Sequence, residues 1–410
     1  MGRRRDLDGI RGIGMIGVLG LHGGTIPGGD FGLIAFFVLS GYLITTLLLR
    51  ERDKTGRIDG LHFYVRRAAR LLPALVLALG GFIAVSGRLG ESLSSAIGNA
   101  VVALFYGMDV KVAYIAHASN PVSWAWSLSV EEQFYLVWPL ILAVALWRNR
   151  VGVAAAIAVV GVVEPTIYRI VTAPKTSYVL LDPNGAHWTF RTYFGVDTRM
   201  DALFVGCLLA MALWKWPQLL NRAVAIVMGT AGLTIIGFAY ADTNVFTRST
   251  YTVWFSVATF ASAGLIYGLL GAPRWIVSRF LAWRPISYLG QISYGVYLWN
   301  STLGLYVGTL VSRHHQFERG TLWLTMTLAV AIASFHLIEQ PILRRVSQRV
   351  TLAPPAEVAA VAAAHSHHPT ALPKPRPESL QPVLAAPVPV PFAEETVEPF
   401  VRVRRRDVDR

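Results

Sequence analysis

Apolar residues run along this chain in ten blocks, each close to the length of a membrane-spanning helix, which is about 17 to 25 residues. Charged residues gather in the connections between the blocks. The blocks cover residues 7–26, 31–49, 71–85, 131–147, 151–171, 198–214, 223–240, 251–270, 286–310 and 322–343. This pattern predicts an all-α membrane protein with about ten transmembrane helices, forming one membrane domain over residues 1–348.

The composition agrees with a membrane protein. The chain has 410 residues, of which 54% are hydrophobic and 15% charged, whereas soluble domains carry about 25% charged residues. The net charge of +13 lies mainly in every second connection, as at 50–70, 148–150, 215–222 and 274–284. That alternation follows the positive-inside rule and argues against nucleic-acid binding. It predicts a multi-pass protein of the inner or plasma membrane with both termini in the cytoplasm.

Two segments depart from the regular pattern. An apolar patch at 96–106 lies in a long outer connection and is interpreted as a re-entrant or interfacial helix; as an eleventh span it would reverse the charge bias downstream. Residues 349–410 are rich in Pro and Ala, which predicts a disordered cytoplasmic tail. A basic cluster at 402–406 either contacts anionic lipid headgroups or is simply solvated.

Several common features are not expected. The first block precedes another span directly, so it is not interpreted as a cleavable signal. The single cysteine, Cys207, excludes an intrachain disulfide and a cysteine-based metal cluster. Two histidines in an outer loop and three in the tail have no metal-ligand spacing and are expected to be solvated; these are His314, His315, His365, His367 and His368.

The first block carries an arginine and a histidine in an apolar setting. Arg11 and His22 are eleven residues apart, which is close to three helical turns, so both lie on one helix face about 16 Å apart. Ionisable residues inside spans are costly and point to function; the alternative for His22 is a hydrogen bond at a helix end. The glycines at 14, 17, 20 and 23 predict close helix packing. The G-x-G-x-x-G match at 12–17 lacks the βαβ context of a dinucleotide site.

Further polar positions fall at the ends of other blocks. Ser127, Glu131 and Tyr135 are spaced by four and share one helix face, although a helix start accounts for a serine and one acid without a function. Arg67 and Arg70 share a face near the cytoplasmic side, where they either hold phosphate or follow the positive-inside rule. Asp197 and Asp201 either orient an acceptor or pair internally at a helix start.

These residues lie in a set of motifs that resembles acyltransferase family 3 of integral membrane O-acyltransferases. The resemblance covers about residues 6–343. The motifs are Arg5-Asp-Leu-Asp8-Gly-Ile-Arg11-Gly with His22, Phe36-Phe-Val-Leu-Ser-Gly41-Tyr-Leu-Ile-Thr, Arg67-x-x-Arg70, Ser127-x-x-x-Glu131-x-x-x-Tyr135, Tyr193-Phe-Gly-Val-Asp197-Thr-Arg-Met-Asp201-Ala-Leu, Ile292-Ser-Tyr-Gly-Val-Tyr-Leu-Trp299 and Ile338-Glu339-Gln-Pro341.

The resemblance implies ten helices and transfer of a short acyl group from cytoplasmic acyl-CoA to a hydroxyl of an envelope glycan or glycolipid. Acetyl-CoA is the expected donor substrate, and no permanently bound cofactor or metal is expected. The family's essential residues correspond to Arg11 and His22, to the Arg67 and Arg70 pair, and to Ser127, Glu131 and Tyr135. Two positions depart from the family pattern, because Ile34 stands where an acid is common and Asn300 where a histidine is usual.

The resulting hypothesis divides the work between the two polar ends of the first helix. His22 is expected to act as a general base on the acceptor hydroxyl, with Glu131 orienting His22 or the acceptor and Tyr135 donating a hydrogen bond. Arg11, Arg67 and Arg70 are expected to hold acyl-CoA. Direct transfer and an acyl-histidine intermediate both remain open, as do the oligomeric state and two other functions, acylation of a small molecule such as a macrolide and glycolipid transport.

Overall fold

A computed structural model of the chain describes residues 4–179, 185–242, 247–312 and 314–352, and within these ranges the regular elements are helices, with one isolated bridge between Tyr178 and Thr247. The α-helices are α1 Arg5–His22, α2 Phe31–Thr55, α3 Gly60–Val85, α4 Leu93–Leu104, α5 Met108–Val110, α6 Trp126–Trp147, α7 Val151–Val171, α8 Gly185–Phe194, α9 Val196–Arg199, α10 Asp201–Lys215, α11 Arg222–Asp242, α12 Phe255–Gly271, α13 Ile276–Leu281, α14 Arg284–Leu310, α15 Gln316–Ser334 and α16 Gln340–Leu352. Short 3-10 or π-helical turns lie at Ser86–Leu89, Lys111–Ala116, Ser123–Ala125, Pro217–Leu219, Thr250–Trp254 and Phe335–Glu339.

Seven helical segments within the described ranges are long and apolar enough to cross a membrane. They are Phe31–Thr55, Gly60–Leu89, Ser123–Trp147, Val151–Val171, Arg222–Ala241, Thr250–Gly271 and Gln316–Val346. The other three predicted spans are the helices α1, α10 and α14, which pack extensively against α14, α2 and α1 respectively. Because neighbouring helices cover much of these three, they tolerate more charge or a shorter length than lipid-facing helices. The prediction of an all-α membrane protein is confirmed.

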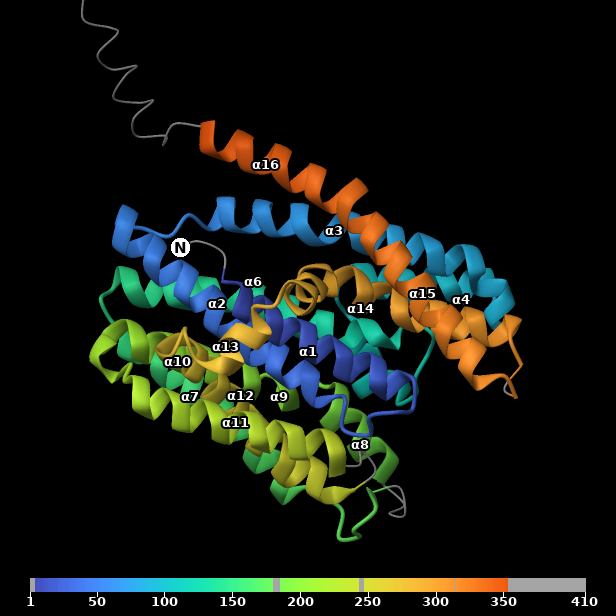
Figure 1. Cartoon of the computed structure of the whole chain (residues 1–410), viewed down its shortest axis with the longest axis horizontal. Helices are drawn as coiled ribbons and strands as arrows, with labels where there is room; N and C mark the ends of the chain where they lie inside the picture. Colours follow the sequence, from blue (N-terminus) through green and yellow to red (C-terminus); the bar gives the residue numbers. More distant parts are fainter. Residues whose placement is uncertain (1–3, 180–184, 243–246, 313, 353–410) are drawn as a thin grey trace, which may run out of the picture. The chain divides into compact units, whose positions relative to one another are not determined.

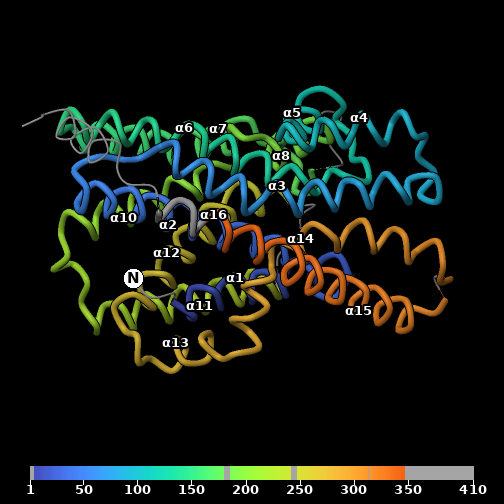
Figure 2. The backbone as a smooth tube through the Cα atoms, turned by 90° about the horizontal axis from the view of Figure 1, so that it is seen from above, coloured from blue at the N-terminus to red at the C-terminus, as the bar shows by residue number. Residues whose placement is uncertain are grey.

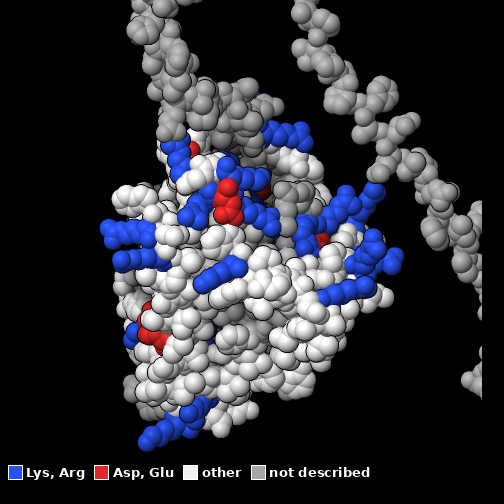
Figure 3. All heavy atoms as spheres, turned by 90° about the vertical axis from the view of Figure 1, so that its left-hand side faces the viewer, with Lys and Arg blue, Asp and Glu red and all other residues white. Residues whose placement is uncertain are grey.

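The connections α2–α3, α6–α7 and α10–α11 lie at one end of the helix bundle (Figures 1 and 2). Figure 3 looks onto this end, where Lys and Arg side chains far outnumber Asp and Glu. We call it the basic end, and the connections α1–α2 and α14–α15 lie at the opposite end. The alternation of basic and less basic connections along the sequence therefore becomes a difference between two faces of the fold.

The apolar patch at 96–106 does not form an eleventh span. Most of it belongs to α4, a helix of 12 residues, which is shorter than the roughly 17 residues that a span requires. α4 packs against α3 in the half of α3 that is away from the basic end (Figure 1). The charge alternation along the rest of the chain is therefore preserved.

Close backbone contacts between helices depend on glycine. A Cβ on Gly290 of α14 would lie 1.8 Å from the carbonyl oxygen of Asp8 in α1, and a Cβ on Gly32 of α2 would lie 2.3 Å from the carbonyl oxygen of Gly14. Neither position has room for a larger residue unless the helices separate. The close packing predicted from the glycine spacing in the first block is confirmed, and it fixes α1 between α2 and α14.

The chain divides into a compact unit over Met1–Ala353 and a second unit over Pro354–Arg410. Helix α16 continues to Leu352, four residues beyond the predicted end of the membrane domain at 348. The predicted tail from residue 353 onward lies outside the described residues.

Candidate active site

A central cavity of about 100 Å³ lies between α1, α2, α3, α6 and α14. Six residues singled out from the sequence line it, and these are Arg11, Arg67, Arg70, Ser127, Glu131 and Tyr135. They come from three helices that are far apart in the sequence. The fold therefore gathers most of the predicted site around one small, polar space.

Glu131 is held in this cavity by two hydroxyl groups. Tyr135 Oη donates a hydrogen bond to Glu131 Oε1 at 2.5 Å, and the Ser40 hydroxyl donates to the same oxygen. The tyrosine lies one turn after the glutamate on α6, as the spacing predicts, whereas Ser40 comes from α2. Since both donors reach one oxygen, the Glu131 carboxylate has a fixed orientation.

The three arginines of the cavity differ in their partners. Arg67 Nε donates to both carboxylate oxygens of Glu132 at 3.0 Å, and its guanidinium lies 3.2 Å from the centre of the Tyr135 ring. Arg67 is thus held by the protein itself. Arg11 and Arg70 have no hydrogen bond or ion pair with any residue in the described ranges, so their donors are available to a ligand in the cavity.

A second cavity, of about 540 Å³, lies nearer the basic end between α1, α2 and α3. We call it the basic cavity. Its positively charged lining residues are Arg4, Arg11, Arg50, Lys54 and Arg66, against the acids Asp8 and Glu51. Arg11 lines both this cavity and the central one, so the two adjoin at that side chain.

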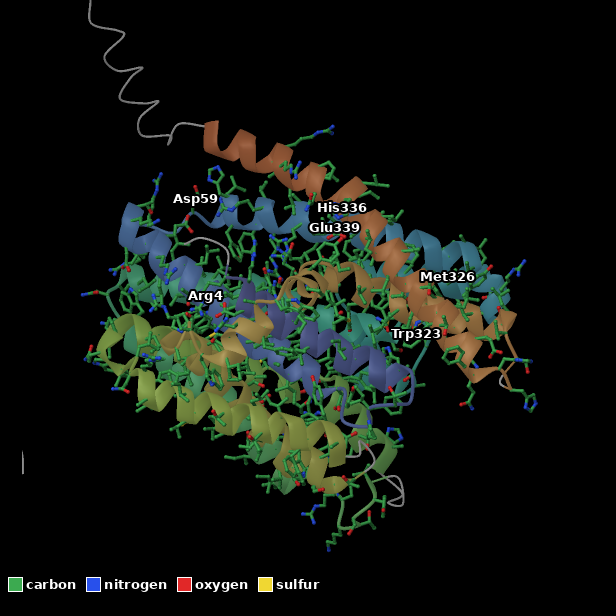
Figure 4. All side chains as sticks on the ribbon, in the orientation of Figure 1. Arg4, Asp59, Trp323, Met326, His336 and Glu339 are labelled. Carbon is green, nitrogen blue, oxygen red and sulfur yellow. The ribbon has the colours of Figure 1, made fainter. Side chains whose placement is uncertain are left out.

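A third cavity, of about 810 Å³, contains His22; we call it the histidine cavity. Its walls include the aromatic residues Trp124, Trp126, Tyr193, Phe194 and Trp323, together with polar side chains such as Asn120, Gln316 and Arg319. Figure 4 labels Trp323 on α15 and Arg4 of the basic cavity, which lie toward opposite ends of the bundle. The structure thus separates the basic cavity from the histidine cavity, which has aromatic walls.

His22 is paired with Asn300, which stands out in the sequence only because a histidine is usual at this position in the family. Its Nδ1 atom is within hydrogen-bonding distance of Asn300 Oδ1, and Asn300 is fully buried in α14. Glu131 was expected to orient either His22 or the acceptor, but it lines the central cavity and makes no described contact with His22. In the structure, Asn300 holds the histidine.

A layer of hydrogen bonds separates the central cavity from the histidine cavity. Tyr297 Oη lies 2.5 Å from Ser127 Oγ and also donates to the carbonyl oxygen of Trp124. Ser127 and Tyr297 line the central cavity, whereas Trp124 lines the histidine cavity. Tyr297 is also only one helical turn before Asn300, so the layer lies close to His22.

The two predicted aspartates lie elsewhere. Asp201 forms a buried ion pair with Arg169 at 2.7 Å, and Asp197 pairs with Arg191 at 2.8 Å. Neither aspartate lines any of the three cavities. The structure therefore favours internal pairing over a role in orienting an acceptor.

The acid missing at position 34 has a neighbour one turn earlier. Ile34 is packed in the core, with 2% of its surface exposed, and Asp30 is fully buried. Neither oxygen of the Asp30 carboxylate has a hydrogen-bond partner in the described part of the chain. The guanidinium of Arg199, which is also buried, lies over the ring of Phe255 at 4.0 Å. Asp30 and Arg199 both lie outside the three cavities. Within the described ranges, no group of three His, Cys, Asp or Glu residues is arranged to hold a metal ion.

Sequence reasoning missed Ser40, Tyr297 and Trp323 as parts of the site. Ser40 and Tyr297 lie within quoted motifs, and each is a polar side chain in an apolar block, which was a usable signal. Trp323 offered none, because tryptophans are common near membrane interfaces. Its role depends on the packing of α15 against α14.

The fold and these cavities define a multi-pass, all-helical membrane protein with a polar site buried between its helices. The acyltransferase domain model of acyltransferase family 3 matches residues 4–338, and the chain belongs to this family. The resemblance seen in the motifs is therefore confirmed. No solved structure matches the chain.

Three relatives illustrate the family. The chain is 30% identical to YrhL of Bacillus subtilis (strain 168) over 358 residues, covering 82% of this chain and 54% of the relative. It is 29% identical to the O-acetyltransferase OatA of Staphylococcus aureus (strain NCTC 8325 / PS 47), covering 83% and 57%. It is 30% identical to the peptidoglycan O-acetyltransferase OatA of Listeria monocytogenes, covering 82% and 55%. The chain thus spans little more than half the length of these relatives.

Proposed function

We propose that the chain is a membrane O-acyltransferase that transfers an acetyl group from acetyl-CoA to a hydroxyl of a cell-envelope glycan. The observation that carries the proposal is the placement of two groups on one helix. Arg11 faces the central and basic cavities, whereas His22 lies in the histidine cavity. Helix α1 thus presents positive charge to the donor at Arg11 and a base to the acceptor at His22.

The donor is assigned to the basic end. The positive-inside rule orients the basic end toward the cytoplasm, which is where acyl-CoA is made. The start of α1, at Arg5, lies on this same side. Arg11 lines the basic cavity, where its guanidinium donors match phosphate oxygens. Arg70 lines the central cavity, where its donors are available to the oxygens of the pantetheine arm and the acyl group. Arg67 acts through Glu132 and Tyr135 in this proposal, because its Nε and Nη2 atoms already donate to Glu132.

The size of the central cavity supports a short acyl group. A dry cavity of about 150 Å³ holds one benzene molecule, and this cavity is about 100 Å³. An acetyl group fits such a space, whereas a long acyl chain does not.

The acceptor is assigned to the histidine cavity. Its volume of about 810 Å³ lies in the range of small-molecule sites, about 300 to 1,000 Å³. Broad aromatic faces with interspersed amide and guanidinium groups suit a sugar ring, which has both apolar faces and hydroxyl groups. The names of all three relatives contain the word O-acetyltransferase, and two of these names include peptidoglycan; a glycan acceptor is consistent with those names.

The proposed reaction uses His22 as a general base. Its free ring nitrogen takes the proton of the acceptor hydroxyl, and the oxygen forms a bond to the thioester carbonyl carbon. The carbon–sulfur bond then breaks, and the CoA thiolate leaves and takes up a proton. Glu131, whose carboxylate is held by Tyr135 and Ser40, orients the donor in the central cavity. A covalent acyl-histidine followed by transfer to the acceptor gives the same products.

The test uses the purified chain in proteoliposomes with labelled acetyl-CoA and three acceptor pools, namely peptidoglycan fragments, membrane glycolipids and soluble hydroxylated compounds such as a macrolide. We expect label in a glycan and its loss in His22→Gln. Transfer to the macrolide alone would support small-molecule acylation. Movement of glycolipid across the vesicle without any acyl transfer would overturn the proposal in favour of a transporter.

A further inference from the structure

The orientation of the Asn300 side chain is determined by its surroundings. Its Nδ2 atom donates to the carbonyl oxygens of Val296 at 3.1 Å and Tyr297 at 2.7 Å. An amide nitrogen has two hydrogens, and these bonds use both. Turning the amide over would place its oxygen against two backbone carbonyl oxygens, where it has no donor.

The acceptor character of Asn300 Oδ1 defines the protonation of His22. Oδ1 can only accept, so His22 Nδ1 must carry the hydrogen in the bond that joins them. In a neutral imidazole with Nδ1 protonated, the lone pair is on Nε2. The nitrogen that can accept a proton is therefore the one that is not bonded to Asn300.

Two further contacts keep Asn300 in place. The indole Nε1 of Trp323 donates to the Asn300 backbone oxygen at 2.7 Å, which ties α15 to α14 beside the histidine. The Ser301 hydroxyl lies 3.4 Å from Asn300 Oδ1 and adds a second, longer donor to the same acceptor. Since Asn300 is fully buried, water does not compete for these bonds.

We propose that Asn300 is a positioning residue that fixes His22 as its Nδ1-protonated tautomer and leaves Nε2 as the proton acceptor in the histidine cavity. This inference rests on the proposed function, in which His22 is the base. In serine proteases, an asparagine in place of the aspartate holds the histidine in the wrong tautomer. Here the backbone takes both amide hydrogens, so an asparagine gives the productive one.

The same bond accommodates the reaction. When Nε2 takes the proton of the acceptor hydroxyl, both ring nitrogens carry hydrogen, and Nδ1 still donates to Oδ1. The asparagine is neutral throughout, so it holds the ring without adding a titratable partner at position 300. The departure of Asn300 from the usual family histidine thus has a defined consequence at the site.

The test compares Asn300→Leu, which removes the acceptor at similar volume, with Asn300→Asp, which retains an acceptor. Thr302→Val is the matched control, because Thr302 is also buried in α14 and its hydroxyl has no partner in the described part of the chain. We expect kcat to fall about 10- to 100-fold in Asn300→Leu, as a share of the effect of general-base catalysis. We expect Asn300→Asp to recover part of this loss, the KM for acetyl-CoA to stay the same, and the control to keep wild-type kcat.

A direct readout separates positioning from a structural role. Protein labelled with ¹⁵N-histidine gives the His22 signals as the difference between wild type and His22→Gln, and these report which ring nitrogen is protonated. We expect Nδ1 protonation in wild type and Asn300→Asp, and a mixture of tautomers in Asn300→Leu. Wild-type kcat in Asn300→Leu, or an unchanged tautomer signal with lowered kcat, would overturn the inference. Full activity of His22→Gln would instead overturn the proposed function.

Discussion

The basic cavity adjoining Arg11 leads to a prediction about which part of the donor it holds. Arg66 and Lys54 line this cavity and have no hydrogen bond or ion pair with residues in the described ranges. CoA carries its phosphates on the nucleotide part, whereas the pantetheine arm carries the thioester. We therefore expect Arg66→Gln and Lys54→Gln to weaken binding of the nucleotide part and to leave the reacting end undisturbed.

The magnitude follows from charge-assisted hydrogen bonding. Such a bond contributes about 1.5 to 3 kcal/mol, and each 1.4 kcal/mol is a factor of ten in affinity. Arg66 is half-buried, so we expect its variant to raise the KM for acetyl-CoA by about tenfold or more. Lys54 is exposed, where solvent screening leaves charge interactions small, so its variant should have the smaller effect.

The assay measures KM and kcat in proteoliposomes with acetyl-CoA and with S-acetylpantetheine, which lacks the nucleotide. The KM should rise for acetyl-CoA alone, with kcat unchanged. Arg57→Gln is the matched control, because Arg57 is an exposed residue at the same end that does not line the cavity. An equal rise in KM for both donors, or no rise for either, would refute this assignment. Competition by anionic lipid in all variants alike would point to a headgroup site instead.

Three further predictions concern stability. Glu132→Gln removes the charge from the part-buried pair with Arg67 but keeps an amide oxygen as acceptor, so we expect a loss of about 1 to 3 kcal/mol, and a Tm unchanged from wild type in detergent would contradict the pairing. Gly290→Ala forces α1 and α14 apart, so we expect little folded, monodisperse protein on size exclusion; normal yield would show that the helices adjust. Asp59 caps α3 by accepting from the His62 backbone N–H at 3.0 Å, and removing such a cap costs about 1 kcal/mol. Hydrogen bonds from His62 lower the Asp59 pKa, so this contribution is present above the ordinary carboxyl pKa of about 3.9 and is lost as the pH falls through the lowered value. Thermal unfolding of Asp59→Ala and wild type from pH 3 to 6 measures the difference.

The fold was largely predictable because membrane insertion leaves a strong signal in sequence. The length of each apolar block and the charge of its flanks determine a crossing helix and its direction. These signals do not show which helices are surrounded by other helices and which face lipid. From the sequence, the helices α1, α10 and α14 resemble ordinary spans, yet neighbouring helices cover them in the structure. The close packing of α1 against α14 at Gly290 shows why polar groups on these two helices are tolerated.

The site was predictable where function required a charged or ring-bearing side chain within an apolar block. Arg11 was found because it lies within an apolar block and Glu131 because it begins one. Arg70 lies in the basic connection before the third block and was singled out by its spacing from Arg67 and by the family motif; the fold brings all three residues to one cavity. Residues that act through orientation were not found, because their chemistry is ordinary. Asn300 stood out only as a substitution, and its importance comes from side-chain bonds to His22 on α1 and to the Val296 and Tyr297 carbonyls one turn earlier on α14.

The hydrogen-bonded layer formed by Tyr297, Ser127 and the Trp124 carbonyl explains how the proposed donor and acceptor sides of the site are kept apart. Arg11 and His22 line cavities that share no residue, so in the proposed reaction an acetyl group in the central cavity does not meet the acceptor directly. Tyr297 is one turn from Asn300, which holds His22, so a small displacement of α14 would change both the layer and the base. In the proposed reaction, the hydrogen bond between Tyr297 and Ser127 must therefore open before the acyl group reaches the acceptor, which links transfer to correct placement of His22.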